Sequence, residues 1–404
     1  MSRSIPYLLL IGLLGFAPAS AWASGDDSHE EILLTRAMQA VADGDLDRAL
    51  REVDAALATH PDFHLAHLVR GDILLARSRP LQDVGGATAG GERLGELRDE
   101  ARLRLAGLRE VAPANHFPRQ ILRLAPSQRY ALLADASRAR LYVFENVEGM
   151  PRLIRHFYMT VGRNGVDKRV EGDKKTPLGV YVVTQHIPRA RLTDFYGAGA
   201  FPLDYPNDWD RTLGRTGYGI WLHGVPADTY SRPPRASDGC VVFANSDFTE
   251  LARYIEPGVT PVVIAERMEW LPEAEWLAAR SNLLAKLDNW KADWERLDQD
   301  GFLTHYSARF LSSEGRGWVE SKRRNIGNKD WIKLHLSDIS LFLHSSDNLA
   351  VVTFNQNYDS NSFRSMSRKR LHLALEEGEW RIALERSLQS LPLVAARETS
   401  NDAP

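Results

Sequence analysis

The stretch "WLHGVPADTYSRPPRASDGCVVFAN", which runs from Trp221 to Asn245, decides the fold of the central part of the chain and contains its only cysteine, Cys240. Two short apolar segments, "GIWLH" and "CVVF", have the β-branched and aromatic residues that favour strands. The loop between them, from Val225 to Ser237, is long enough to fold the chain back and bring the imidazole of His223 to the thiol. We therefore predict a β-rich region organised around a cysteine and a histidine.

The pairing of a thiol with an imidazole points to nucleophilic catalysis. A nearby imidazole can hold the thiol proton, and such a pair lowers the pKa of cysteine from about 8.5 to roughly 3.5–7.5. Gly224 and Gly239 flank the pair and leave room for a substrate. The backbone N–H groups of Gly239 and Cys240 are predicted to hold the oxyanion of a tetrahedral intermediate. The alternative is that Cys240 is a small buried apolar residue and that His223 is an ordinary hydrogen-bonded histidine.

Four further residues of the same stretch are candidates for the site. Arg232 and Arg235 could grip a substrate carboxylate through paired hydrogen bonds, or they are solvent-facing arginines of a loop stiffened by prolines. Tyr230 could form a wall of the pocket, or it simply packs. Ser237 is predicted to brace the imidazole through its hydroxyl or its carbonyl, or it stabilises a turn.

Two separated motifs resemble those of L,D-transpeptidase (YkuD) catalytic domains. The first is His223-Gly224, a loop, and then Ser237, Gly239 and Cys240. The second is "GDKKTPLGVY", from Gly172 to Tyr181, which is similar to the family's G-D-x-x-T-P-x-G element. The resemblance implies that Cys240 attacks peptidoglycan stem tetrapeptides, releases the terminal D-alanine and passes the acyl group from a thioester to an amine. Asp173 of the second motif is expected to shape a turn and not to act as an acid.

The sequence departs from this family at two positions. Many members have histidine where this chain has Asp238, which we place among the substrate-binding residues, and arginine where this chain has Val242. Arg232 and Arg235 are the candidates to replace that arginine. The longer segment "TYSRPPRASDGCVVFAN" (residues 229–245) and the C-terminal region resemble those of a subgroup that includes a cell-shape-determining L,D-carboxypeptidase. An L,D-transpeptidase is the first hypothesis, an L,D-carboxypeptidase with water as acceptor the second, and a catalytically silent wall-binding scaffold the third.

The predicted fold class is a multidomain chain with an N-terminal α-helical repeat-like hairpin, a central β-rich L,D-transpeptidase fold and a C-terminal α+β NTF2-like cone. The helix-turn-helix rhythm after residue 28 resembles tetratricopeptide units. The cone is indicated by a helical face that contains Leu287, Trp290, Trp294 and Leu297. The alternating segments "IKLHL", "ISLFLH" and "NLAVVTFNQ", and a hairpin that turns at Glu377-Gly378, follow this helix and predict a four-stranded antiparallel sheet. The predicted boundaries are 28–115 for the helical region, 125–266 for the catalytic domain, 274–390 for the accessory domain and 391–404 for a tail.

The remaining features concern location and partners. Residues 1–23 have the short apolar run and the small-residue cleavage site of a signal peptide, which predicts export to the periplasm and only transient membrane contact. A net charge of −3 gives no argument for nucleic acid. His60, His64 and His67 have helical spacing, but we expect surface histidines and no metal or cofactor. Stem peptides are the expected partners, with a wall-associated protein or a glycan as a candidate for the accessory domains.

Overall fold

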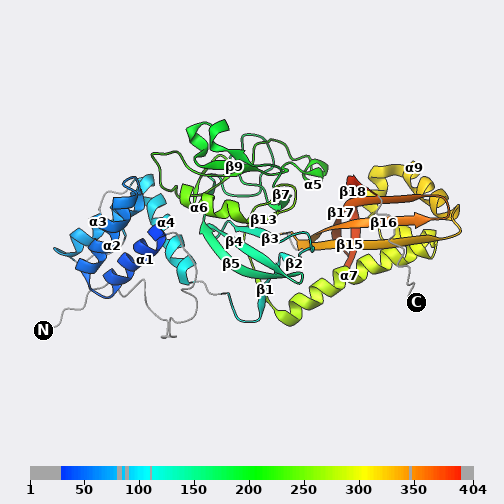
Figure 1. The fold of residues 1–404 in the computed structure, drawn as a ribbon, viewed down its shortest axis with the longest axis horizontal. Helices are drawn as coiled ribbons and strands as arrows, with labels where there is room; N and C mark the ends of the chain where they lie inside the picture. Colours follow the sequence, from blue (N-terminus) through cyan, green and yellow to red (C-terminus); the bar gives the residue numbers. More distant parts are fainter. Residues whose placement is uncertain (1–28, 80–83, 87–90, 110–111, 345–347, 393–404) are drawn as a thin grey trace, which may run out of the picture. The chain divides into compact units, whose positions relative to one another are not determined.

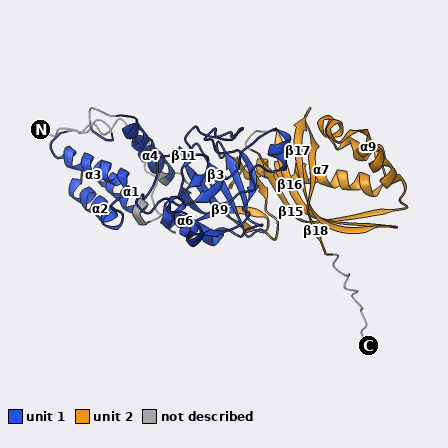
Figure 2. Ribbon diagram, turned by 90° about the horizontal axis from the view of Figure 1, so that it is seen from above, with its two compact units in different colours: residues 1–114, 128–145, 152–270 blue, residues 115–127, 146–151, 271–404 orange. Residues whose placement is uncertain are grey.

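The structure is a computed structural model that describes residues 29–79, 84–86, 91–109, 112–344 and 348–392. The predicted signal peptide lies outside these residues, as does nearly all of the predicted tail. The chain divides into two compact units (Figure 2), one made of residues 1–114, 128–145 and 152–270 and the other of residues 115–127, 146–151 and 271–404. No described helix has the length and apolar character needed to cross a membrane.

The first unit begins with four helices (Figure 1), which are α1 (His29–Ala42), α2 (Leu46–Thr59), α3 (His64–Ala76) and α4 (Glu92–Arg109). Gly44 turns the chain between the first two helices with φ of 80°, and Asp45 caps α2 by accepting a hydrogen bond from the backbone of Arg48. The helices bury small and apolar residues against one another, and the same cluster includes Tyr230 from the β-rich region.

The β-rich region is built on a five-stranded sheet of the first unit. Its order is β5 (Met150–Tyr158), β4 (Arg140–Val147), β3 (Tyr130–Asp135), β13 (Pro261–Ala265) and β7 (Gly179–Val182). β13 runs parallel to β3 and antiparallel to β7. Every residue of β13 is buried, as expected for a β-branched segment in the middle of a sheet.

A second sheet carries the cysteine and histidine motif. Its order is β12 (Val241–Val242), β10 (Trp221–His223), β9 (Gly199–Pro202) and β8 (Ile187–Pro188). β10 and β12 are parallel, with Leu222 opposite Val241 and His223 opposite Val242. A short parallel pair joins β11 (Arg235–Ser237) to β6 (Val161–Gly162). The helices α5 (Asp208–Thr212) and α6 (Asn245–Leu251) complete this region.

The second unit is a long antiparallel sheet packed against helices (Figure 1). Its strands, in order, are β18 (Glu379–Leu391), β17 (Arg364–Glu376), β16 (Leu349–Ser360), β15 (Ile332–Leu343) and β2 (Ile121–Arg123). Its helices are α7 (Glu273–Glu295), α8 (Gln299–Thr304) and α9 (Ala308–Gly327), and β1 (His116–Pro118) pairs with β14 (Trp270–Pro272). Glu377 and Gly378 form the predicted hairpin turn, with φ of 51° and 83°.

Three details of this unit differ from the sequence-based expectation. The segments "IKLHL" and "ISLFLH" form one strand, β15, with a register shift between Ser337 and Ser340. The expected four-stranded sheet gains β2 as a fifth strand, which comes from a segment far earlier in the chain. Leu297 lies beyond the end of α7 with φ of 60°, so it is not on the helical face shared by Leu287, Trp290 and Trp294.

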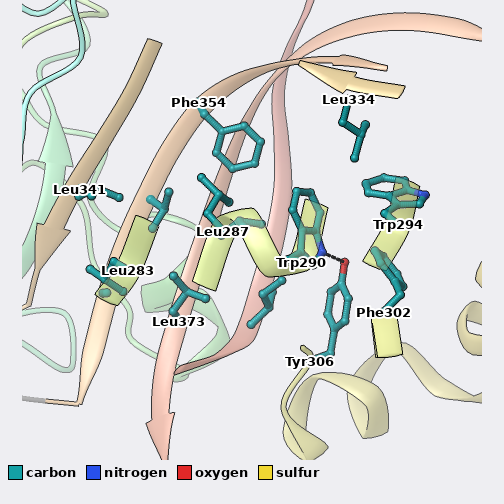
Figure 3. Close-up of a cluster of buried hydrophobic side chains, with 14 of the residues drawn as sticks. Leu283, Leu287, Trp290, Trp294, Phe302, Tyr306, Leu334, Leu341, Phe354 and Leu373 are labelled. Carbon is teal, nitrogen blue, oxygen red and sulfur yellow. Dashed lines mark hydrogen bonds between the residues drawn. The ribbon is translucent and has the colours of Figure 1, made fainter. Parts of the chain in front are cut away.

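Aromatic residues fill the space between α7 and the sheet (Figure 3). Trp290 is 1% exposed, and its Nε1 donates a hydrogen bond to the hydroxyl of Tyr306 at 3.2 Å. Trp276 is fully buried, and its Nε1 donates to the carbonyl of Ile121 on β2 at 3.0 Å. The indoles of Trp290 and Trp276 therefore both have a partner for their polar atom, which is the condition for burying tryptophan at low cost.

Candidate active site

His223 ends β10 and is 1% exposed. Its Nδ1 lies 2.6 Å from the carbonyl oxygen of Gly224. Because a carbonyl only accepts hydrogen bonds, Nδ1 carries the proton and Nε2 is left as the basic nitrogen. The rings of Phe195 and Tyr196 lie with their centroids 5.9 and 5.1 Å from the imidazole. The tautomer and the orientation of the imidazole are thus fixed by the backbone and by two aromatic rings.

Gly224 is required for the packing of Asn245, a role that the sequence did not indicate. A Cβ on Gly224 would lie 2.2 Å from Oδ1 of Asn245. That oxygen accepts hydrogen bonds from the backbones of Ala198 and Val225, at 2.8 and 3.2 Å, and Nδ2 donates to the Val225 carbonyl at 2.8 Å. Asn245 is the first residue of α6, and these hydrogen bonds connect the loop after His223 to the segment before β9.

Cys240 lies directly before β12 and is partly exposed. Continuing the register of β10 and β12 back by one residue places Cys240 beside Trp221, on the face of the sheet that carries His223. Two residues of strand separate these positions, which corresponds to roughly 7 Å along the chain direction. The thiol donates a hydrogen bond to the carbonyl of Gly219, with a distance of 3.3 Å from Sγ to oxygen.

The electrostatics of the resting site differ from those of a preformed ion pair. Burial raises the pKa of the Cys240 thiol to about 11; Asp238 adds to this effect, and the backbone N–H of Trp221 and the cations Arg232 and Lys168 oppose it. Burial also lowers the pKa of His223 to about 4, against the hydrogen bond to Gly224. Both groups are therefore neutral near neutral pH, and the expected thiolate–imidazolium pair is not the resting state.

Ser237 stabilises the turn that precedes the cysteine and does not brace the imidazole. Its hydroxyl donates to the carbonyl of Cys240 at 2.6 Å and accepts from the backbone of Gly239 at 3.1 Å. Its carbonyl accepts from the backbone of Arg163 at 2.8 Å. Of the two alternatives, the turn-forming one is therefore correct. The N–H of Gly239 is already used by Ser237, so it does not serve as the predicted oxyanion donor in this state.

The second motif supports the same turn through Thr176, which is fully buried. The threonine hydroxyl donates to the carbonyl of Gly239 at 2.9 Å and accepts from the backbone of Gly162 on β6 at 2.9 Å. Gly239 has φ of 125°, and a Cβ there would lie 2.7 Å from the Lys175 carbonyl. The "TP" element and the cysteine turn are thus one hydrogen-bonded structure, although 63 residues separate Thr176 from Gly239.

Asp173 shapes a loop, as predicted. Its carboxylate accepts a hydrogen bond from Nζ of Lys168 at 2.8 Å and others from the backbones of Arg169, Val170 and Lys175. Burial alone would raise its pKa, but these hydrogen bonds lower it to about 2. A carboxylate so strongly held in its charged form is unsuited to donate a proton near neutral pH.

Arg232 is the predicted cation that the structure brings to the site. Its guanidinium lies 5.0 Å from the centroid of Phe195, the same ring that lies against His223. Burial lowers the pKa of Arg232, and the nearby Cys240 and Asp238 raise it. The charge of Arg232 also lowers the pKa of His223. A single cation therefore acts on both the thiol and the imidazole.

Three other predicted substrate-binding residues, Arg235, Asp238 and Tyr230, do not share the position of Arg232. Arg235 is an exposed residue at the start of β11, opposite Val161. Asp238 is 65% exposed and forms an ion pair with Arg163 at 2.8 Å. The expectation that Tyr230 forms a wall of the pocket was wrong. Tyr230 is 4% exposed and packs among the N-terminal helices.

Sequence reasoning missed Phe195, Tyr196, Gly219 and Trp221. Burial and the charge of the Cys240 thiolate raise the pKa of Tyr196. The two aromatic residues lie on a short 3-10 turn, Asp194–Tyr196, that precedes β9. No motif marks them, and only the antiparallel pairing of β9 with β10 brings this segment to the end of the strand that carries His223.

The three N-terminal histidines do not form a metal site. His67 Nε2 lies 2.7 Å from the carbonyl of Pro61, and the ring of His60 lies 4.5 Å from that of Tyr230. Across the residues that the structure describes, no group of His, Cys, Asp and Glu side chains is arranged to hold a metal ion.

Two family models match parts of the chain. Residues 129–264 match the YkuD family, the L,D-transpeptidase catalytic domain, and residues 282–386 match the Cds6 C-terminal NTF2-like domain. The chain thus contains N-terminal helices, an L,D-transpeptidase-family catalytic domain and a C-terminal NTF2-like domain, which confirms the predicted fold class and the family resemblance.

Two solved structures are similar to most of the chain. Bd1075 of Bdellovibrio bacteriovorus has 27% sequence identity and a TM-score of 0.61, and the match covers 67% of this chain and 98% of Bd1075. Pgp2 of Campylobacter jejuni, described as a helical cell shape determining protein, has 22% identity and a TM-score of 0.56, over 72% of this chain and 100% of Pgp2. At that identity the likeness to Pgp2 concerns the fold. No curated protein matches the sequence.

Proposed function

We propose that this protein is a cysteine-dependent L,D-transpeptidase that acts on the stem tetrapeptides of peptidoglycan. Cys240 would attack the bond between a diaminopimelate-type residue and the terminal D-alanine, and the acyl group would pass to an amine of a second stem peptide. The observation that carries the proposal is the imidazole of His223. Its Nδ1 proton is held by the carbonyl of Gly224, so that Nε2 is the basic nitrogen on the face of the sheet where Cys240 lies.

The neutral resting state favours a mechanism in which proton transfer accompanies attack. Nε2 of His223 takes the proton from Sγ while sulfur bonds to the carbonyl carbon, whose oxygen becomes an oxyanion. When the C–N bond breaks, the imidazolium gives this proton to the departing D-alanine amine and leaves a thioester on Cys240. The acceptor amine then attacks the thioester, loses a proton through Nε2 and restores the thiol.

Arg232 is the proposed counter-charge for this reaction. It is half-buried beside the thiol and the imidazole, and a positive charge in a partly desolvated site stabilises the negative charge that develops on the intermediate. The same guanidinium could first bind the carboxylate of the terminal D-alanine, because arginine is suited to that group.

A second candidate is an L,D-carboxypeptidase, in which water replaces the amine and a tripeptide is released. Val242 favours it. The position that holds arginine in many members of the family is a valine that is 1% exposed and lies opposite His223 in the parallel pair of strands. If that arginine helps to hold an acceptor peptide, its absence leaves water as the competing acceptor.

The test is incubation of the purified protein with tetrapeptide muropeptides, followed by mass spectrometry of the products and of the intact protein. We expect loss of D-alanine and an acyl adduct on the protein. Dimers identify the transpeptidase, and free tripeptide without dimers identifies the carboxypeptidase. Cys240→Ala should abolish both products, and Arg232→Ala should reduce them while Arg235→Ala, a matched exposed arginine, should not. Product formed by Cys240→Ala would contradict the mechanism, and no product from the wild type would favour the wall-binding scaffold.

We also propose that residues 1–23 direct export to the periplasm, where the substrate lies. Their composition supports this location. Fusion of residues 1–30 to a reporter that is active only after export should give a signal, and loss of the apolar run should abolish it. Retention of the full-length protein in the cytoplasm would contradict the proposal.

A further inference from the structure

We propose that the N-terminal helices position the catalytic loop, and that Glu100 and Ser231 are positioning residues that hold Arg232 beside Cys240 and His223. This inference rests on the proposed thiol chemistry. It gives the helical region a function in the reaction that neither the family match, which begins at residue 129, nor the motif assigns.

The first contact is a partly buried hydrogen bond between α4 and the loop. The hydroxyl of Ser231 donates to Oε1 of Glu100 at 2.7 Å, and Nε of Arg104 donates to the same oxygen at 3.0 Å. Glu100 and Arg104 are 1% and 2% exposed. Burying an ion pair is costly unless further hydrogen bonds complete it, and the hydroxyl of Ser231, the residue next to Arg232, is such a completion.

The second contact holds the residue before Ser231. The ring of Tyr230 lies 4.3 Å from that of Phe63 and 4.5 Å from that of His60, measured between centroids. Both partners belong to the connection between α2 and α3. Tyr230 is thus an aromatic anchor of the loop in the helical core, and the helices contact two consecutive residues just before Arg232.

The third contact reaches the backbone of Arg232 itself. Its carbonyl accepts hydrogen bonds from the hydroxyls of Tyr158 and Thr160, at 3.1 and 3.0 Å. The guanidinium of Arg104 lies 3.8 Å from the centroid of the Tyr158 ring, a distance at which a cation and an aromatic face attract each other. Arg104 therefore connects the helix to the tyrosine that holds the loop from its other side.

The docking of α4 on the sheet has a tight point at Gly107. Nη2 of Arg140, a fully buried residue of β4, donates to the carbonyl of Arg104 at 3.1 Å. A Cβ on Gly107 would lie 2.2 Å from Nε of Arg140. Gly95 lies on the same helix with nothing within 4 Å of the corresponding position. Alanine at either position favours the helix itself, so only the variant at Gly107 disturbs the docking.

The experiment uses Cys240, the only cysteine of the chain, as its reporter. The rate of alkylation by iodoacetamide is measured by intact mass as a function of pH on the full chain. The charged or titratable groups that act on this thiol are Arg232, Asp238, Lys168 and Tyr196. Because the cation of Arg232 favours the thiolate, Arg232→Ala should move the pH profile to higher pH. If the midpoint of the profile rises by about one pH unit, alkylation at a fixed pH below the midpoint becomes about tenfold slower.

We expect Ser231→Ala and Gly107→Ala to move the profile in the same direction as Arg232→Ala, with alkylation roughly threefold to tenfold slower at fixed pH. Gly95→Ala should match the wild type. In the double variant, Ser231→Ala should add nothing to Arg232→Ala, because its effect passes through the guanidinium. Far-ultraviolet circular dichroism shows whether each variant is folded.

Three results would overturn the inference. They are a wild-type profile for both Ser231→Ala and Gly107→Ala, a wild-type profile for Arg232→Ala, or effects of Ser231→Ala and Arg232→Ala that simply add. The readout needs no peptidoglycan. Failure of the wild type to process muropeptides would therefore refute the proposed function while the titration still tests the positioning of the loop.

Discussion

The resting thiol of Cys240 should react slowly with alkylating reagents near neutral pH. The pKa of the thiol is raised from its ordinary value of 9.0 to about 11, first by burial and then by Asp238. This rise in pKa lowers the thiolate fraction about 100-fold at any pH below about 9. Since the thiolate is the reactive form, we expect iodoacetamide to modify the folded protein about 100-fold more slowly at about pH 8 than an unperturbed thiol.

The measurement is the alkylation rate of the wild type across a range from about pH 6 to 11. The same protein in denaturant, where the thiol is fully hydrated, is the internal reference. The rate in the folded state should keep rising beyond about pH 10, where the rate of the reference levels off because its thiol is almost fully ionised. Asp238→Asn should accelerate the reaction, because it removes a negative charge that opposes the thiolate. The effect of this variant should be modest, since the carboxylate is 65% exposed and largely screened by water.

A fast reaction with a midpoint below about pH 7.5 would refute this reasoning and restore the thiolate–imidazolium pair that the sequence suggested. The prediction also changes what slow alkylation means. Slow alkylation of the thiol does not by itself identify a catalytically silent scaffold. The thiol is also alkylated slowly in an active site that binds its substrate before it removes the thiol proton. Only the muropeptide assay separates the two.

Three further predictions concern stability. Asp173→Asn should lower the free energy of unfolding by about 1–2 kcal/mol near pH 7, because the pKa of Asp173 is lowered to about 2 and water screens part of the effect. The loss, measured in urea, should shrink as pH falls below about 4 and vanish below about 2. Thr176→Val should cost about 1–3 kcal/mol for each of the two backbone groups it leaves unpaired, whereas Thr176→Ser keeps the hydroxyl. Trp276→Ala should cost about 3–5 kcal/mol in calorimetry, because the indole is fully buried.

The fold could be predicted where local pattern decides it. The hairpin at Glu377–Gly378 has a turn residue with positive φ between two alternating segments, and this signal is local. The fifth strand of the same sheet could not be predicted, because β2 is only three residues long and pairs with Leu341 and Phe342 across more than 200 positions of sequence. The register shift within β15 was likewise hidden, since a bulge looks like a break between two strands.

The candidate active site could also be predicted only in part from the sequence. Spacing placed His223 and Cys240 on neighbouring strands, because "GIWLH" and "CVVF" are both β-rich and the loop between them is long. Spacing could not assign hydrogen bonds. Gly224 supplies its carbonyl to the imidazole, and Ser237 uses its hydroxyl within its own turn. Both residues were in the motif, but the partner of a polar atom depends on three-dimensional packing that the linear pattern does not contain.

The departure from the family pattern at Val242 can be understood from the positions of the charges. Val242 is buried between His223 and Thr160, where a guanidinium would have no water and would further disfavour a protonated imidazole. In the proposed mechanism the cation comes instead from Arg232 on the loop, which is half-buried and acts electrostatically on both Cys240 and His223. The position of an arginine on a loop depends on the conformation of that loop. This loop is held by the hydrogen bond from Ser231 to Glu100, on a helix that precedes the catalytic domain. A cation on the loop instead of the strand therefore requires that the loop be held in place, which is the function proposed for the N-terminal helices.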